Sequence, residues 1–96
     1  FCLSRGLGDV YKRQSQRNVA CVITSTLEAG IGVAAALHLA AASPEITMAC
    51  GLATLDLLVD DLLSDGLLVS NGHIHVPAGP GLGVQLDEPA LKWYTA

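Results

Sequence analysis

The stretch NVACVITSTLEAGIG, residues 18–32, holds the features that decide the fold. Its first half, 18–24, is a run of β-branched and small apolar residues without polar alternation, which is typical of a strand buried on both faces. Ser25 follows, with Glu28 three positions later, and this S/T-x-x-E spacing is that of a capping box. The aliphatic run continues to about Ala42, with Pro44 as a stop signal. The stretch therefore predicts a buried strand that leads directly into a helix.

A second strand and helix follow the first pair. Residues 46–50 predict a short strand, 51–54 a loop and 55–63 a helix. Strands and helices that alternate with short connections are typical of parallel β/α architecture. Two such units are too few for a complete barrel, which takes about 250 residues, and they would leave both sheet edges bare. The sequence therefore predicts an α/β fold that is a piece of a TIM-type barrel.

The last third of the chain has a different pattern. Asn71-Gly72 lies between two apolar stretches and is the most favoured two-residue hairpin turn. A Pro/Gly loop, 77–83, and a short helix at about 87–94 complete this tail. The expected cross-strand pairs are Val69 with Ile74, Leu67 with Val76, Ser70 with His73, and Leu68 with His75.

The first fourteen residues, FCLSRGLGDVYKRQ, differ from the rest. They carry three of the five basic residues, begin without Met and fit neither a helix nor a strand. They resemble translated sequencing-adapter read-through, with a genuine loop of an interrupted domain as the alternative. We interpret 1–14 as a non-native head, 15–63 as two β/α units of a barrel, and 64–96 as the hairpin, loop and final helix.

Composition excludes several classes of protein. Hydrophobic residues make up 51% of the chain and charged ones 15%, which is the reverse of a disordered sequence. Three cysteines, an odd number, do not make a disulfide framework, so we expect a cytoplasmic location. Cys21 and Cys50 lie in apolar runs.

The most apolar stretch, 31–42, is interrupted by His38, a satisfied helical residue in our interpretation. It falls short of the roughly 20 residues of a membrane span, so no membrane partner is expected.

Charge and motif spacing argue against nucleic-acid, metal and nucleotide sites. From residue 18 onward the chain has one base, Lys92, against eight acids, so the basic footprint of a nucleic-acid-binding protein is missing. His73 and His75 share a strand face, but zinc needs at least three protein ligands, so a solvated hairpin face is expected. The glycine-rich loops 6–8 and 79–83 lack the Gly-Lys-Ser/Thr ending of a phosphate loop. Four aspartates at helical spacing lack the calcium-loop pattern and predict a solvated helix face: Asp56, Asp60, Asp61 and Asp65.

The junction at 25–32 is the strongest candidate site. A helix N-terminus binds anions through its free amides and its dipole, and the carboxyl ends of barrel strands carry the active site. A capping box alone would explain Ser25 and Glu28. However, Gly30 and Gly32 each weaken the helix by about 1 kcal/mol relative to Ala, which favours close approach by a ligand.

These residues carry a resemblance to a known family. Residues 23–32, ITSTLEAGIG, resemble the strand-seven tip of the enolase superfamily in its muconate-lactonizing branch. GPGLGV at 79–84, followed by Asp87, resembles the closing Pro-Gly-Leu-Gly segment of that branch. ACGLAT at 49–54 most resembles o-succinylbenzoate synthases, lyases of menaquinone biosynthesis. The resemblance covers residues 18–95.

The resemblance implies a capping domain and a (β/α) barrel. This chain would keep the last two β/α units of the barrel, then a hairpin and a short helix that return to the capping domain. The implied reaction is a Mg²⁺-dependent dehydration through an enediolate with lysine as base. The family's catalytic lysines and metal ligands come from strands two to six, and neither Lys12 nor Lys92 matches a catalytic motif. The fragment alone would hold no Mg²⁺, be inactive, and need the missing N-terminal part of its own chain as partner.

The resemblance also assigns residues to a small carboxylate substrate. Ser25 and Thr26 match positions where the strand-seven end contacts the carboxylate tail, and Glu28 matches a Glu/Asp common in that motif. Dipeptide epimerases of this branch carry an Asp-x-Asp where this chain has Cys50-Gly51-Leu52, which offers no carboxylate, so an amino-dipeptide substrate is disfavoured. The implied substrate-binding residues are Ser25, Thr26, Glu28 and Gly51. The alternatives are a muconate cycloisomerase, an N-acylamino-acid racemase, a dipeptide epimerase or a short non-enzymatic interaction module.

Overall fold

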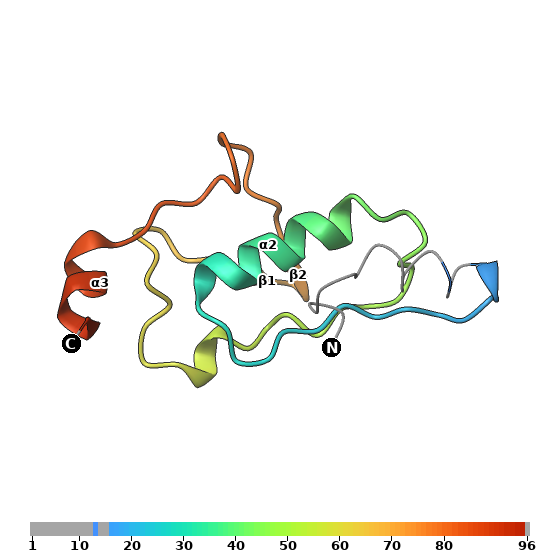
Figure 1. Cartoon of the computed structure of the whole chain (residues 1–96), viewed down its shortest axis with the longest axis horizontal. Coiled ribbons are helices and arrows are strands. Elements are labelled where there is room, and N and C mark those ends of the chain that lie inside the picture. Colours follow the sequence, from blue (N-terminus) through green and yellow to red (C-terminus); the bar gives the residue numbers. More distant parts are fainter. Residues whose placement is uncertain (1–12, 14–15, 96) are drawn as a thin grey trace.

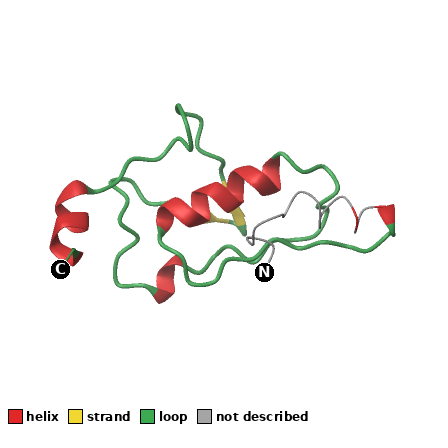
Figure 2. Cartoon of the chain, viewed as in Figure 1, coloured by secondary structure: helices red, strands yellow, loops and turns green. Residues whose placement is uncertain are grey.

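The protein was analysed as a computed structural model that describes residue 13 and residues 16–95. Helix α2 lies at the centre of the molecule, and α3 lies at one end beside the C-terminus (Figure 1). Most of the remaining chain is loop (Figure 2). Apart from Arg13, the interpreted non-native head and its glycine-rich loop 6–8 lie outside the described residues. The elements are α2 (Gly30–Ala41), the 3₁₀ helix η1 (Leu55–Leu57), β1 (Val69–Ser70), β2 (His73–Ile74) and α3 (Glu88–Tyr94).

The two predicted parallel strands meet at their carboxyl ends. Thr24 and Gly51 form an isolated parallel bridge. The amide of Gly51 donates to the carbonyl of Ile23 at 2.8 Å, and the amide of Ser25 donates to the carbonyl of Gly51 at 3.0 Å. The two segments meet at this bridge, below α2 in the view of Figure 1. The parallel arrangement is thus confirmed at the tips. The expected strand lengths are wrong, because a pair without further strands is marginal.

Helix α2 begins later than the sequence indicates. It begins at Gly30, its N-cap is Ala29, and no side chain caps it. The predicted capping box of Ser25 and Glu28 is therefore wrong. The backbone bonds of Ser25 hold it at the strand tip, and Leu27 adopts a φ of 52°, which a helix does not allow. The helix ends at Ala41, ahead of the proline, as predicted.

The apolar face of α2 covers the strand tips. Ile23, Val33, Ala36, Leu37 and Leu52 form the buried cluster, and Ile23 and Val33 are 1% and 0% exposed. Many other large apolar side chains of the described residues stay exposed, so the core is small for a chain of this hydrophobicity. Within residue 13 and residues 16–95, no helix combines the length and hydropathy that crossing a bilayer requires.

The predicted helix at 55–63 is wrong beyond its first turn. Only η1 forms, and the chain then turns at two aspartates. The Asp60 carboxylate accepts from the amide of Leu62 at 2.8 Å, and that of Asp61 accepts from the amide of Leu63 at 3.1 Å. Such local bonds compete with helix formation, so the expected helical face of four aspartates does not exist.

The hairpin has the predicted centre. Asn71 and Gly72 both have positive φ, 52° and 74°, as a type I′ turn needs. The ring Nδ1 of His73 lies 2.8 Å from the carbonyl oxygen of Asn71. The ladder stops after two pairs, so the outer pairs expected from the sequence do not form. The observed pairs are Val69 with Ile74 and Ser70 with His73.

The C-terminal tail is fastened to the rest of the chain at two places. Leu63 and Leu86 form an antiparallel bridge, and the amide of Asp87 donates to the carbonyl of Leu62 at 2.8 Å. The ring Nε2 of His38 lies 2.7 Å from the carbonyl oxygen of Leu82 in the Pro/Gly loop. A carbonyl only accepts, so Nε2 carries a proton there. The interpretation of His38 as a satisfied helical residue is confirmed.

We expect Asp87→Ala to lower the free energy of unfolding by about 1 kcal/mol. Asp87 is the N-cap of α3, where its carboxylate accepts from the amide of Ala90 at 3.1 Å. Thermal unfolding followed by circular dichroism measures the change. Asp87→Asn is the control because it keeps a side-chain acceptor, and an equal loss in both variants would contradict the capping role.

Candidate functional site

The candidate site lies at the carboxyl ends of the two strand tips. The hydroxyl of Ser25 lies 2.6 Å from the hydroxyl of Thr54. The same Ser25 hydroxyl donates to the carbonyl of Gly51 at 3.3 Å. Ser25 and Gly51, two of the residues that the resemblance assigns to the substrate, thus lie together, because the carboxyl ends of parallel strands meet at one sheet edge.

Thr26 and Glu28 form a second polar pair beside the first. The Thr26 hydroxyl donates to the Glu28 carboxylate at 3.4 Å. Glu28 lies against the first turn of α2. A Cβ atom added to Gly32 in that turn would meet the Glu28 carboxylate. A negative charge is favourable at that end of a helix. Thr26 is exposed and Glu28 half-buried, so both can be reached from solvent.

The first turn of α2 differs from the predicted anion site. Backbone carbonyls already accept from three of its first four amides: Gly30 donates to Asp61, and Gly32 and Val33 donate to Ala29. The free amides on which the prediction rested are therefore largely engaged. Hydroxyl groups, rather than helix amides, are the main donors available here.

The close approach expected at Gly30 is made by the chain itself. A Cβ there would meet the side chain of Leu63 and, at 2.9 Å, the carbonyl oxygen of Asp61. Gly30 is buried and leaves no room for a ligand. The glycine is thus explained by packing against the 61–63 turn, which corrects the sequence-based hypothesis of ligand approach at this position.

Thr54 is the site residue that the sequence analysis missed. It follows the second strand tip and is half-buried at the start of η1. The signal was present in the sequence, since a hydroxyl residue close behind a strand end lies on the active-site face of a β/α unit. Residue type alone, however, did not indicate that Thr54 contacts Ser25.

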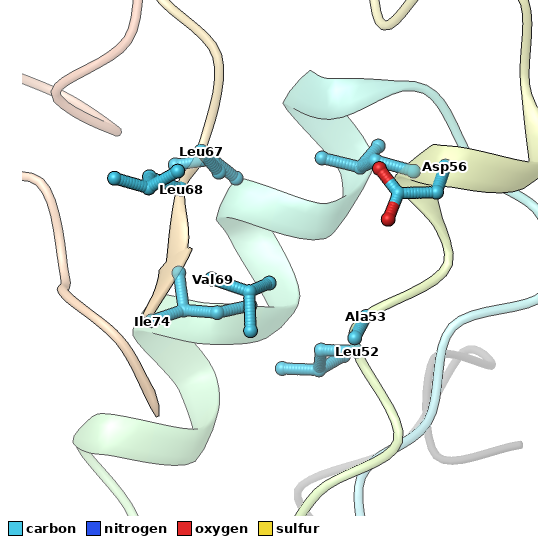
Figure 3. Close-up of a pocket in the computed structure, with 8 residues that line it drawn as sticks. Leu52, Ala53, Asp56, Leu67, Leu68, Val69 and Ile74 are labelled. Atoms are coloured by element: carbon cyan, nitrogen blue, oxygen red, sulfur yellow. The ribbon is translucent and has the colours of Figure 1, made fainter. Parts of the chain in front are cut away.

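A nearby pocket has the wrong lining for a carboxylate. It measures about 170 Å³ and lies between η1 and the hairpin (Figure 3). Aliphatic side chains line it, including Leu52, Val69 and Ile74, and its charged residue is Asp56. Across the part of the chain that the structure describes, no three His, Cys, Asp or Glu residues come close enough to hold a metal ion. The strand ends remain the best-equipped polar site.

Comparison with known proteins gives the family. The model of the family described as "Enolase C-terminal domain-like" matches residues 8–90, which is most of the chain. The chain belongs to this enolase family. The resemblance stated from the sequence is confirmed. The match begins inside the head at 1–14, whose non-native origin stays a prediction.

The enolase-family relatives come from two kinds of enzyme. Muconate cycloisomerase 1 of Rhodococcus opacus is 36% identical over 77 residues, or 80% of this chain and 21% of the relative. An o-succinylbenzoate synthase of Thermobifida fusca is 49% identical over 55 residues, or 57% of this chain and 17% of the relative. The chain thus spans about a fifth of the curated relatives it matches.

Solved structures support the same family. The crystal structure of a muconate lactonizing enzyme from Klebsiella pneumoniae matches with a TM-score of 0.85 and 28% identity, covering 94% of this chain and 25% of that one. The structural neighbours are TIM-barrel enzymes of the enolase superfamily. The α/β barrel class is therefore supported, although the described residues form only two short strands.

Proposed function

We propose that the chain is the C-terminal part of an o-succinylbenzoate synthase-like lyase. Its strand tips at Thr24 and Gly51 would be the last two of the barrel, and the hairpin and α3 would return to a capping domain. The observation that carries the proposal is the cluster of Ser25, Gly51 and Thr54 at the carboxyl ends of these tips. The 49% identity with the Thermobifida fusca synthase favours the synthase.

The proposed task of the site is to hold the carboxylate tail of a small substrate. Ser25 would donate its hydroxyl proton to a carboxylate oxygen. The Thr26 hydroxyl donates its single proton to Glu28 at 3.4 Å in the structure, so it would leave this bond in order to donate to a second carboxylate oxygen. Gly51 is exposed, and the absence of a side chain lets a ligand lie against the strand end. An added Cβ there would also meet the Thr24 methyl at 3.0 Å.

The family implies Mg²⁺, but the described residues do not fit it. They bring no three possible ligands together, and the charged group of the site is the single carboxylate of Glu28. Mg²⁺ usually takes one or two carboxylates together with waters and substrate oxygens. We therefore assign the metal ligands and the catalytic lysines to other parts of the full-length protein, and we expect the chain alone to be inactive.

The proposed partner is the N-terminal part of the same protein. Large apolar side chains are exposed after η1 and around the hairpin, with Val59 98% and Leu68 77% exposed. Apolar surface of this kind marks an interface. The chain spans about a fifth of the length of its relatives, and the rest of a protein of that length is large enough to cover this apolar surface. A cytoplasmic location completes the proposal and rests on the cysteine content alone.

A muconate cycloisomerase is the alternative, because such a relative matches 80% of the chain. Two chimeras distinguish the proposals. Residues 18–95 replace the matching segment of the Thermobifida fusca synthase in one and of the Rhodococcus opacus cycloisomerase in the other. Each is assayed with the substrate of its own parent.

We expect the synthase chimera to be active and Ser25→Ala to lower its kcat/KM by at least about tenfold, the effect of one hydrogen bond to a charged group. Thr47→Ala serves as the control because it also removes a side-chain hydroxyl, at an exposed position outside the candidate site. A folded but inactive synthase chimera beside an active cycloisomerase chimera would overturn the synthase proposal.

A further inference from the structure

Ser25 and Thr54, whose hydroxyls contact each other, are each held in place by a backbone hydrogen bond. The amide of Ser25 donates to the Gly51 carbonyl at 3.0 Å. Thr54 is the N-cap of η1, and its carbonyl accepts from the amide of Leu57 at 3.1 Å. Both residues are half-buried. Their contact at 2.6 Å therefore joins two fixed positions that lie 29 residues apart in the sequence.

Either hydroxyl could be the donor in this hydrogen bond, and proton counting favours one of the two directions. A hydroxyl has one proton to donate. The Ser25 hydroxyl donates its proton to the Gly51 carbonyl, so the proton between the two hydroxyls comes from Thr54. The order is Thr54 to Ser25 to Gly51. In such a chain each bond polarises the next, so Thr54 strengthens Ser25 as a donor.

We propose that Thr54 is a positioning residue that prepares Ser25 to bind a carboxylate. By donating to Ser25, it directs the single Ser25 proton away from Thr54, toward the Gly51 carbonyl at rest and toward a ligand oxygen when substrate is present. The resting bond is long, 3.3 Å, whereas hydroxyl bonds to carboxylates are shorter and roughly twice as strong as neutral ones. When the Ser25 proton leaves the Gly51 carbonyl for a ligand, an anionic acceptor is therefore favoured over an amine or an alcohol. This inference rests on the proposed function.

The test uses Thr54→Val and Thr54→Ser in the active chimera. Valine keeps the shape of threonine but has no hydroxyl, whereas serine keeps the hydroxyl. We expect Thr54→Val to raise KM by about tenfold while kcat changes by less than about threefold. Thr54→Ser is expected to restore KM. In the double variant Ser25→Ala/Thr54→Val, KM should match that of Ser25→Ala, because Thr54 acts through Ser25.

Three kinetic results would overturn the inference. KM of Thr54→Val could stay unchanged while that of Ser25→Ala rises, the two effects could multiply, or Thr54→Ser could fail like Thr54→Val, which would indicate packing. A second readout does not need activity: urea unfolding of the folded synthase chimera for Ser25→Ala, Thr54→Val and both. Non-additive losses of stability support the pair even where both chimeras are inactive and the proposed function fails, and additive losses overturn it.

Discussion

Ile23→Ala is expected to lower the free energy of unfolding by about 2–5 kcal/mol. The Ile23 side chain is 1% exposed and packs with Val33, Leu37 and Leu52 between α2 and the strand tips. Truncation to alanine removes buried apolar surface and leaves a cavity that the small core cannot close. Because Ile23 packs α2 against the strand that carries the site, the loss of packing is expected to destabilise the position of Ser25 as well.

Urea unfolding of the chain, followed by circular dichroism, measures this loss. Ile31→Ala is the matched control, since Ile31 lies on α2 and is 44% exposed. Its effect is expected to stay within about 1 kcal/mol, as for other surface positions. Equal losses in the two variants would contradict the assignment of Ile23 to the core.

Gly30→Ala and Gly32→Ala are expected to change stability in opposite directions. A Cβ at Gly30 would meet the buried Leu63 and the backbone carbonyl of Asp61, which also accepts the Gly30 amide. Overpacking against groups that cannot move costs about 1–3 kcal/mol. A Cβ at Gly32 would meet mainly the Glu28 carboxylate, the end of a flexible side chain. That variant should gain up to about 1 kcal/mol from helix propensity.

The two variants control one another, because they make the same change within one turn of α2. Thermal unfolding at matched concentration gives the sign of each effect. A gain of stability in Gly30→Ala would show that the 61–63 turn does not pack against the helix, and a loss in Gly32→Ala would show that Glu28 cannot move.

Local patterns predicted several elements correctly. The aliphatic run before Pro44 predicted α2, Asn71-Gly72 predicted the hairpin and its central register, and the tail predicted α3 at about its observed position. Each of these signals acts within a few residues, through hydrophobic periodicity, turn conformation or capping.

The errors occurred where distant contacts or side chains compete for the backbone. The capping-box pattern at Ser25 and Glu28 is correct in spacing, but Ser25 is bonded to Gly51, 26 residues away. The helix expected at 55–63 stops after η1, because Asp60 and Asp61 bond the amides that would continue it. Sequence spacing contains no information on which of two possible acceptors an amide or hydroxyl will choose.

The amino-acid sequence was enough to establish the family, the strand tip followed by α2, and the residue types at the strand ends, because these depend on short-range order and on motif identity. The tertiary structure was needed to assemble the site. Thr24 pairs with Gly51, and this bridge brings the hydroxyls of Ser25 and Thr54 within 2.6 Å. The contact exists because parallel strands align their carboxyl ends, and that alignment is made by hydrogen bonds between segments far apart in the chain.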